Sequence, residues 1–217
     1  MSVFDDNKFN LINFTNDIRD MLEDNDSKFG SNPSPRTVGD ICQSLIEDLF
    51  LNGSIKIIGN PIAEKFARRA MADVAFEDKE GNYIMVDIKT HNTTTVFNMP
   101  NLTSVERLSR FYEDDKNYFS ILLITYSINN GLINFNEVKF IPIEYLSWSC
   151  LTLGALGWGQ IQIANSNKIS INQTQTRRQW MLQLCDALEL FYPNEISKIN
   201  ERIERFKKVR IFWEEHK

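Results

Sequence analysis

Histidine and cysteine are scarce in this sequence of 217 residues, which contains two histidines and three cysteines. His91 and His216 are too few for a histidine-rich zinc site or for a catalytic site of the His-Asn-His type. Cys42, Cys150 and Cys185 lie far apart without C-x2-C spacing, so we expect each to pack as a small apolar residue. A chain without paired cysteines suits a reducing compartment, and we expect a cytoplasmic location.

Several other signatures are absent. The sequence has no G-x4-G-K-[ST] loop and no G-x-S-x-G elbow, which argues against ATP-driven movement and against a serine hydrolase of that type. The glycines of segment 154–159 have the wrong spacing for a nucleotide-binding loop. No apolar run approaches the length of a membrane span, and the Asp-rich start does not resemble a signal peptide. We therefore expect neither a membrane partner nor a nucleotide cofactor.

The most informative segment is a pair of apolar runs on either side of the polar, glycine-containing connection 77–82, a pattern typical of a β-hairpin. A hairpin centred at residue 80 sets Asp73 opposite Asp87, with Cβ atoms about 5 Å apart. Because side chains alternate along a strand, Lys89 projects from the same face as Asp87. The sequence thus predicts two carboxylates and an ammonium group at one edge of a core, an arrangement that suits a divalent metal ion and a phosphate.

Triplets with an acid, any residue and a lysine are common, because charged residues make up about a quarter of an average sequence. Others occur here, among them those at 77–79, 114–116 and 137–139. The first two lie in polar, turn-like segments, and the third follows an apolar run, 119–126, that carries no acid as a cross-strand partner. Only the hairpin set combines strand context, a facing acid and a shared face. The alternative interpretation is a group of surface charges on an edge hairpin.

The spacing Asp73-x13-Asp87-Ile88-Lys89 resembles the signature of the PD-(D/E)xK nuclease superfamily. Its continuation, Thr90 followed by Asn92 and Thr93, is similar to type II restriction endonucleases of the EcoRV/HincII type. Segment 176–180, which opens a helix after a polar loop, resembles a late helix start of the same enzymes. One residue departs from the pattern, because Ala72 stands where the family often has proline, which is not a metal ligand.

The resemblance implies a restriction-endonuclease-like fold and a Mg²⁺ site, for which Mn²⁺ can substitute. Mg²⁺ prefers oxygen ligands, and the family pattern implies Asp73, Asp87 and the backbone carbonyl of Ile88 as ligands. Such an ion stabilises charge on phosphoryl oxygens and lowers the pKa of a bound water. Lys89 would orient or help deprotonate that water and stabilise the transition state.

A further acid often comes from the preceding helix in this family. Segment 38–50 has apolar residues with a helical period, and Glu47 falls next to that apolar stripe. We therefore include Glu47 among the candidate catalytic residues. The alternative is a solvated glutamate on a helix surface.

The expected architecture is one α/β domain spanning 1–217, a mixed β-sheet flanked by helices. Residues 1–35, which end in the linker-like stretch 24–35, form a candidate N-terminal helical arm for dimerisation. The helices are expected at 9–22, 38–51, 104–112, 177–191 and 194–212. The strands are expected near 55–58, 70–76, 83–89, 119–126 and 135–141, with a weaker one at 160–164.

The formal net charge of −5 is unfavourable for a DNA-binding protein, but its distribution is uneven. From Lys168 onward there are ten basic and seven acidic residues, a charge of +3, while the rest of the chain carries −8. This bias permits DNA binding and does not argue for it, since base readout and a metal bridge reduce the need for phosphate contacts.

Two segments are rich in side chains that match base edges. The first, 90–101, leaves the catalytic strand directly, and the second, 157–167, reads as a flexible loop or ribbon. Thr176 and Gln179 fit a capping box, and the helix start with its two arginines suits a backbone phosphate. For all three, polar surface structure is the alternative. The candidate DNA-binding residues are Thr90, His91, Asn92, Thr93, Thr94, Asn98, Asn101, Gln160, Gln162, Asn165, Asn167, Thr176, Arg177 and Arg178.

The sequence favours a Mg²⁺-dependent, sequence-specific double-stranded DNA endonuclease. A symmetric site needs two copies of a single-site enzyme, so a homodimer cutting a palindrome is expected. Blunt ends are implied by the resemblance alone. One alternative is a repair or recombination nuclease of the same superfamily that reads DNA structure. The other is a non-catalytic DNA-binding or partner-binding protein with this fold.

Overall fold

The computed structural model describes residues 4, 8–51, 58–61 and 71–216 of the chain. The strand expected at 55–58 therefore lies almost wholly outside the described residues. Among the described helices, none combines the length and the apolar character needed to cross a membrane.

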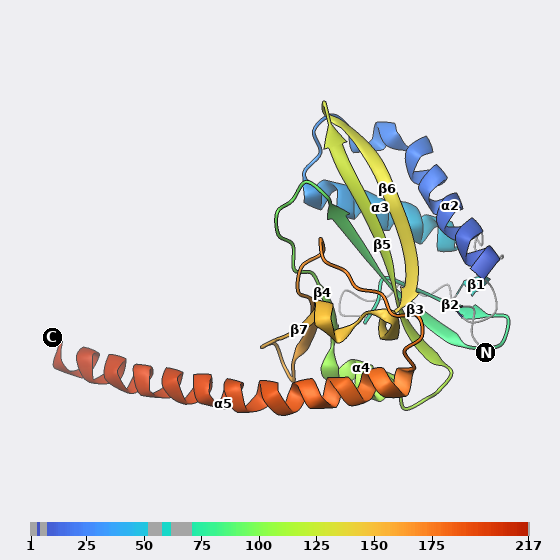
Figure 1. Ribbon diagram of the computed structural model, residues 1–217. Coiled ribbons are helices and arrows are strands. Elements are labelled where there is room, and N and C mark those ends of the chain that lie inside the picture. The colour runs from blue at the N-terminus through green and yellow to red at the C-terminus, as the bar shows by residue number, and fades with distance from the viewer. Residues whose placement is uncertain (1–3, 5–7, 52–57, 62–70, 217) are drawn as a thin grey trace.

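A curled β-sheet of five strands forms the centre of the molecule (Figure 1). In spatial order its strands are β1 (Gly59–Pro61), β2 (Val74–Asp78), β3 (Tyr83–Asn92), β5 (Asn117–Asn129) and β6 (Leu132–Pro142). β3 and β5 run parallel, and the other neighbours are antiparallel. The fold is therefore mixed α/β with a mixed sheet, which confirms the class expected from the sequence.

A smaller antiparallel sheet lies beside the central one. Its order is β4 (Asn101–Ser104), β8 (Gln160–Ile163) and β7 (Leu151–Gly154). Only β8 was expected. β4 and β7 are four residues each, too short to give a clear period of two in the sequence.

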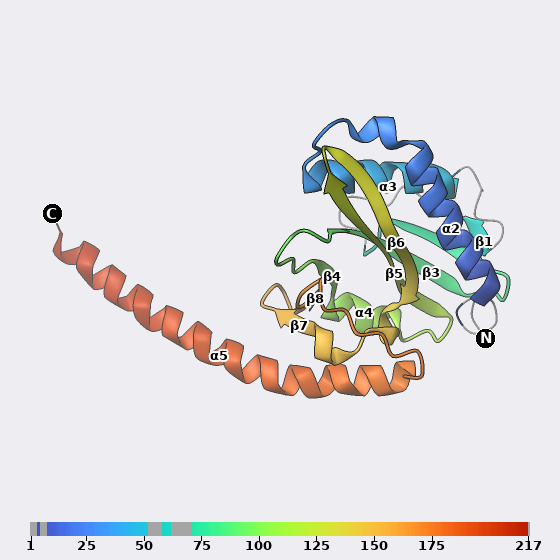
Figure 2. The same cartoon turned by 45° about the horizontal axis from the view of Figure 1, so that its top comes forward.

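Helices cover both faces of the central sheet (Figures 1 and 2). On one face lie α2 (Lys8–Asp24) and α3 (Pro35–Leu51), and on the other lie α4 (Val105–Phe111) and the start of α5 (Arg177–Glu215). The helices expected at 9–22, 38–51 and 104–112 are thereby confirmed.

Alternate residues of the sheet supply two separate cores, as the period of two in a strand requires. On β5, Leu122 and Ile124 pack in the core under α2 and α3, while Ile121 and Leu123 pack in the core that includes α4 and α5. Both sets are nearly inaccessible to solvent. The central sheet therefore fixes which face each residue of the hairpin presents.

The closing helices are one helix and not two. The expected break between 191 and 194 was wrong, because α5 continues through Pro193 for 39 residues in all. A proline inside a helix removes one backbone hydrogen bond and costs about 3 kcal/mol, which is why the sequence favours a break. The Asn194 side-chain amide donates to the carbonyl of Leu190 at 3.0 Å and supports the turn around the proline.

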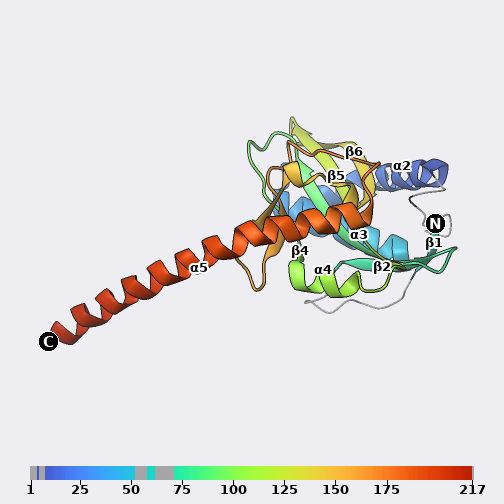
Figure 3. The same ribbon diagram turned by 60° about the horizontal axis from the view of Figure 1, so that its bottom comes forward.

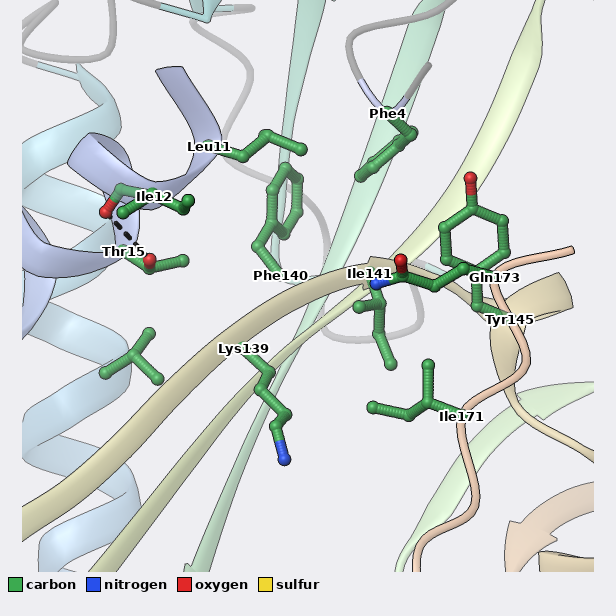
Figure 4. A pocket seen from close by; sticks show the side chains of 11 residues that line it. Phe4, Leu11, Ile12, Thr15, Lys139, Phe140, Ile141, Tyr145, Ile171 and Gln173 are labelled. Atoms are coloured by element: carbon green, nitrogen blue, oxygen red, sulfur yellow. Dashed lines mark hydrogen bonds between the residues drawn. The ribbon is translucent and has the colours of Figure 1, made fainter. Parts of the chain in front are cut away.

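The apolar side of α2 is used within the chain. Phe14, Ile18 and Leu22 are buried in the core that α2 shares with α3 and β6. A pocket of about 490 Å³ lies between α2, β6 and the segment around Ile171 (Figure 4). It contains none of the candidate catalytic residues. The role of residues 1–35 as a dimerisation arm stays a prediction. Among the α2 side chains that the structure describes, Ile12 is the exposed large apolar one.

Candidate active site

The hairpin has the register that the sequence predicts. Val74 pairs with Val86 and Phe76 with Ile84, so the pairing is centred at residue 80. Asp73 comes directly before β2, and its backbone N–H donates to the carbonyl of Val86 at 3.0 Å. The two acids thus lie at the same end of the β2–β3 pair.

Asp87 and Lys89 share one face of β3 and form an ion pair. The Lys89 Nζ lies 2.7 Å from the Asp87 Oδ1. Asp87 is only 5% exposed, and this burial raises the pKa of its carboxyl to about 7. The charge of Lys89 lowers that pKa and the charge of Asp73 raises it further. The charged form of this carboxyl is therefore costly unless further positive charge lies beside it. Such an environment is typical of a carboxylate that binds a cation.

Asp73 is held by the backbone and by helix α3. Its Oδ2 accepts a hydrogen bond from the N–H of Ile88 at 2.7 Å, and its Oδ1 accepts one from the Gln43 Nε2 at 3.2 Å. Burial raises the pKa of Asp73, the Ile88 N–H and the charge of Lys89 lower it, and the charge of Glu47 raises it. The Asp73 carboxylate thus accepts the Ile88 N–H, which a backbone carbonyl would accept if β2 extended further.

Glu47 belongs to the same group of side chains, as the sequence predicts. It faces Asp73 through Gln43, whose Nε2 also donates to the Glu47 Oε1 at 2.8 Å. Gln43 was not predicted. Its position four residues before Glu47 puts both on one side of α3, a signal that becomes useful only once the helix is known to lie over the hairpin.

Helix α3 can reach the hairpin because it approaches β3 closely. A Cβ atom on Gly39 would lie 3.3 Å from the Thr90 Oγ1, so glycine allows this separation. Gln43 and Glu47 follow at successive turns of the same helix side. Because α3 lies this close to the hairpin, the Gln43 side-chain amide can donate to both Glu47 and Asp73.

The donor chemistry at the hairpin fits a divalent cation. The Asp87 Oδ2 is buried and has no hydrogen-bond partner among the described residues, so a metal ion could bind this oxygen. The Ile88 N–H points towards Asp73, and since the N–H and C=O of a strand residue share a side, the Ile88 carbonyl points the same way. Among the described residues, no three His, Cys, Asp or Glu side chains are already gathered as a metal-binding group. The candidate ligands at the hairpin are therefore the carboxylates of Asp73 and Asp87 and the carbonyl of Ile88.

The two segments predicted to read bases lie against each other. The buried His91 Nε2 is 2.8 Å from the Asn167 Oδ1, and the Asn167 Nδ2 donates to the carbonyls of Thr95 and Val96 at 2.7 and 3.2 Å. Asn98 lies 3.5 Å from the His91 Nδ1. His91 directly follows Thr90 on β3, so this network joins the end of β3, the strand that carries Asp87 and Lys89, to both segments.

Other predicted contact residues are partly used inside the chain. The Asn92 Oδ1 accepts from the N–H and hydroxyl of Thr94, and the Thr93 hydroxyl donates to the carbonyl of Tyr126. Asn101 and Gln162 are joined by a side-chain hydrogen bond across β4 and β8.

The remaining polar groups of the second segment differ in surroundings. Gln160 is half-buried on β8, and the Asn165 Oδ1 accepts from the N–H of Asn167 and so forms a turn. The second segment is therefore a strand followed by a turn, and not only a loop.

The start of α5 has the predicted capping box between Thr176 and Gln179. Arg178 is exposed, whereas Arg177 is mostly buried and pairs with the buried Glu144 at 3.2 Å. The Arg177 guanidinium also lies over the ring of Tyr118, 4.2 Å from its centroid. Arg177 thus has a structural role that the sequence did not reveal, because Glu144 is 33 residues away.

Comparison with known proteins adds no family to this picture. No protein-family model matches the chain, and no curated protein matches it. The functional argument therefore stands on the geometry of the site.

Proposed function

We propose that this protein is a Mg²⁺-dependent, sequence-specific double-stranded DNA endonuclease of the type II restriction class, with a restriction-endonuclease-like fold. The observation that carries the proposal is the group formed by Asp73, Asp87 and Lys89, with Glu47 linked through Gln43. These are the residue types that hydrolysis of a phosphodiester by a metal-assisted water requires.

Each side chain has a role in this proposal. Asp73, Asp87 and the carbonyl of Ile88 would hold Mg²⁺, which when bound supplies charge stabilisation at the phosphoryl oxygens and a more acidic water. Lys89, fixed by Asp87, would direct its ammonium group towards the scissile phosphate and the attacking water. Glu47 would accept a proton or bind a water at the same site through the position that Gln43 gives it.

Sequence readout would come from the segments joined by His91 and Asn167. Their amides and hydroxyls leave the catalytic strand directly, so base contacts and the scissile phosphate would lie close together. A palindromic site would be cut by two copies of the chain, one on each strand.

Incubation of the purified chain with phage or plasmid DNA and Mg²⁺, followed by sequencing of the fragment ends, tests the proposal. Discrete fragments with one shared end sequence are expected. A smear, or cleavage only at junctions, would favour a structure-specific repair nuclease, and absence of cleavage with tight DNA binding would favour a non-catalytic protein.

Substitutions of the candidate catalytic residues test whether cleavage depends on this site. Lys89→Ala and Asp87→Asn are each expected to lower the cleavage rate by about a thousandfold or more. Glu137→Gln is the matched control, because Glu137 and Lys139 are an acid-x-lysine pair on β6 with an ion pair at 2.8 Å, and β5 lies between β6 and the hairpin. The control is expected to retain full activity.

A further inference from the structure

Only the first part of helix α5 lies against the body of the molecule (Figure 3). Trp180 and Leu184 are buried there, and the Tyr192 hydroxyl donates to the carbonyl of Trp158 at 2.7 Å. After Tyr192 the helix extends away from the rest of the described chain, as all three ribbon views agree (Figures 1, 2 and 3). This part, residues 193–215, is here named the α5 tail.

The α5 tail carries a stripe of exposed apolar side chains, and their exposed fractions run from 48% to 69%. They follow one another at intervals of three and four residues, with Arg210 filling the one gap. This is the heptad spacing that two helices need to pack along a common seam. The stripe consists of Ile196, Ile199, Ile203, Phe206 and Trp213.

The stripe begins where the row of side chains that packs on the body leaves it. This row passes from the body to the tail at four-residue intervals, through Trp180, Leu184, Leu188, Tyr192 and Ile196. Each such step turns about 40° around the helix, so the row winds away from the packed side and reaches the exposed stripe at Ile196. Since a long helix in water owes most of its stability to packing of an apolar face, the second half lacks the packing that the first half has.

The charge of the α5 tail favours a second copy of this chain as the partner of the stripe. The α5 tail has six basic and five acidic residues, so two copies side by side do not accumulate charge of one sign. A helix so close to neutral has little attraction for a DNA backbone or for an anionic membrane surface, both of which call for a basic face. At 1.5 Å per residue the tail is about 35 Å long, enough for about three heptads.

We propose that the α5 tail pairs with the α5 tail of a second copy of this chain, through the stripe from Ile196 to Trp213. The pairing buries the exposed stripe of each copy against the stripe of the other. In the first half of α5 the body of the molecule provides such cover. The proposed pairing assigns the self-association surface to α5 and not to the N-terminal helix α2, whose Phe14, Ile18 and Leu22 are buried within the chain. The inference stands apart from the cleavage chemistry.

Sedimentation velocity and light scattering of the full chain, over a wide range of protein concentration, test the proposal. The wild type is expected at about twice the chain mass of 25.3 kDa. Ile199→Glu combined with Ile203→Glu is expected to weaken the dimer about a hundredfold or more, since both copies would bury charge in the seam. Ile199→Ala with Ile203→Ala, which keeps helix propensity, is expected to weaken it in the same direction.

The matched control is Ser197→Glu with Lys208→Gln, which makes the same change in net charge on the opposite side of the helix. It is expected to remain dimeric. A monomeric wild type at the highest soluble concentration, with or without duplex DNA, would overturn the proposal, as would glutamate variants that stay dimeric. Equal dissociation of the control would also refute it, because the stripe would then not be the seam. DNA cleavage is measured separately and decides none of these outcomes.

Discussion

At the scale of single residues, Asp87 is the most informative side chain. Burial acts against its charge, Lys89 acts in favour of it, and burial has the larger effect. One carboxylate oxygen is paired with Lys89, and the other has no hydrogen-bond partner among the described residues. The proposed metal ion would bind this second oxygen and offset the cost of the buried charge.

The first prediction concerns the stability cost of Asp87. Burial raises its folded-state pKa from the usual 3.8 to about 7, so the folded protein holds this proton more tightly than the unfolded chain. The stabilisation from the bound proton is complete below pH 3.8 and is lost as pH rises to about 7. At pH 8 the charged form therefore costs stability, on the order of a few kcal/mol. Asp87→Asn is expected to raise the thermal midpoint of the metal-free protein at pH 8 and to change it little at pH 5.

Thermal unfolding in the presence of a chelator measures this difference. The Glu137→Gln variant serves as control, because Glu137 is exposed and its pair with Lys139 lies on β6. An Asp87→Asn variant that is less stable than the wild type at pH 8 would contradict the prediction and would make Asp87 a structural residue.

The second prediction concerns the metal. Below a pH of about 7 a proton competes with the cation for Asp87, so Mg²⁺ is expected to raise the thermal midpoint more at pH 8 than at pH 6. Asp87→Asn is expected to lose the shift at both values, whereas Glu137→Gln keeps it. A Mg²⁺ effect of equal size in wild type and Asp87→Asn would mean that the ion binds elsewhere.

At the scale of elements, the site depends on the contact of helix α3 with the hairpin. Gln43 donates to both Glu47 and Asp73, so one amide separates two carboxylates that would otherwise repel each other. The absence of a side chain at Gly39, which lies against Thr90, favours this close approach of the helix. The sequence places both elements correctly but carries no local sign that they touch.

The third prediction tests Gln43 as a positioning residue. Gln43→Ala removes a hydrogen bond to Asp73 and leaves the Glu47 charge nearby, so the pKa of Asp73 is expected to rise further above its usual value. The acid limb of the pH–rate profile is then expected to move to higher pH, with a fall of about tenfold in rate at pH 7. Gln43→Glu is expected to enlarge the shift. A reduced rate with an unmoved pH profile would indicate only a general loss of structure.

At the scale of the whole molecule, the central sheet separates two cores, and the start of α5 closes the second one. Its anchor is the contact of Arg177 with Glu144, Tyr112 and Tyr118, which join α5 to α4 and β5. Glu144 is buried, and Arg177 is the cation that pairs with it.

The fourth prediction concerns the buried pair of Arg177 and Glu144. Arg177→Met leaves the Glu144 carboxylate buried without its cation and is expected to lower the free energy of unfolding by about 3 kcal/mol or more. Arg177→Met combined with Glu144→Gln is expected to recover part of the loss. Chemical denaturation of the two single variants and the double variant measures this as a double-mutant cycle. Strictly additive losses would show that the two residues do not act as a pair.

Much of the fold could be predicted because its signals are local. The hairpin register followed from a polar connection between two apolar runs, and the capping box at Thr176 followed from two residues three positions apart. The same local rule failed at Pro193, where the breaking effect of proline was outweighed and the helix continued. Gln43, Glu144 and the link between His91 and Asn167 were missed, since their partners lie 30, 33 and 76 residues away.

The sequence by itself determined the strand pairing and the identity of the charged side chains, because a period of two and a short turn leave one register that buries the apolar residues. Only the tertiary structure decided that α3 places Gln43 and Glu47 over Asp73, and that Asp87 is buried deeply enough to shift its pKa. It also decided that the described part of the chain covers only the first half of α5. Burial and contacts between distant segments depend on how whole elements pack, and no short stretch of sequence carries that information.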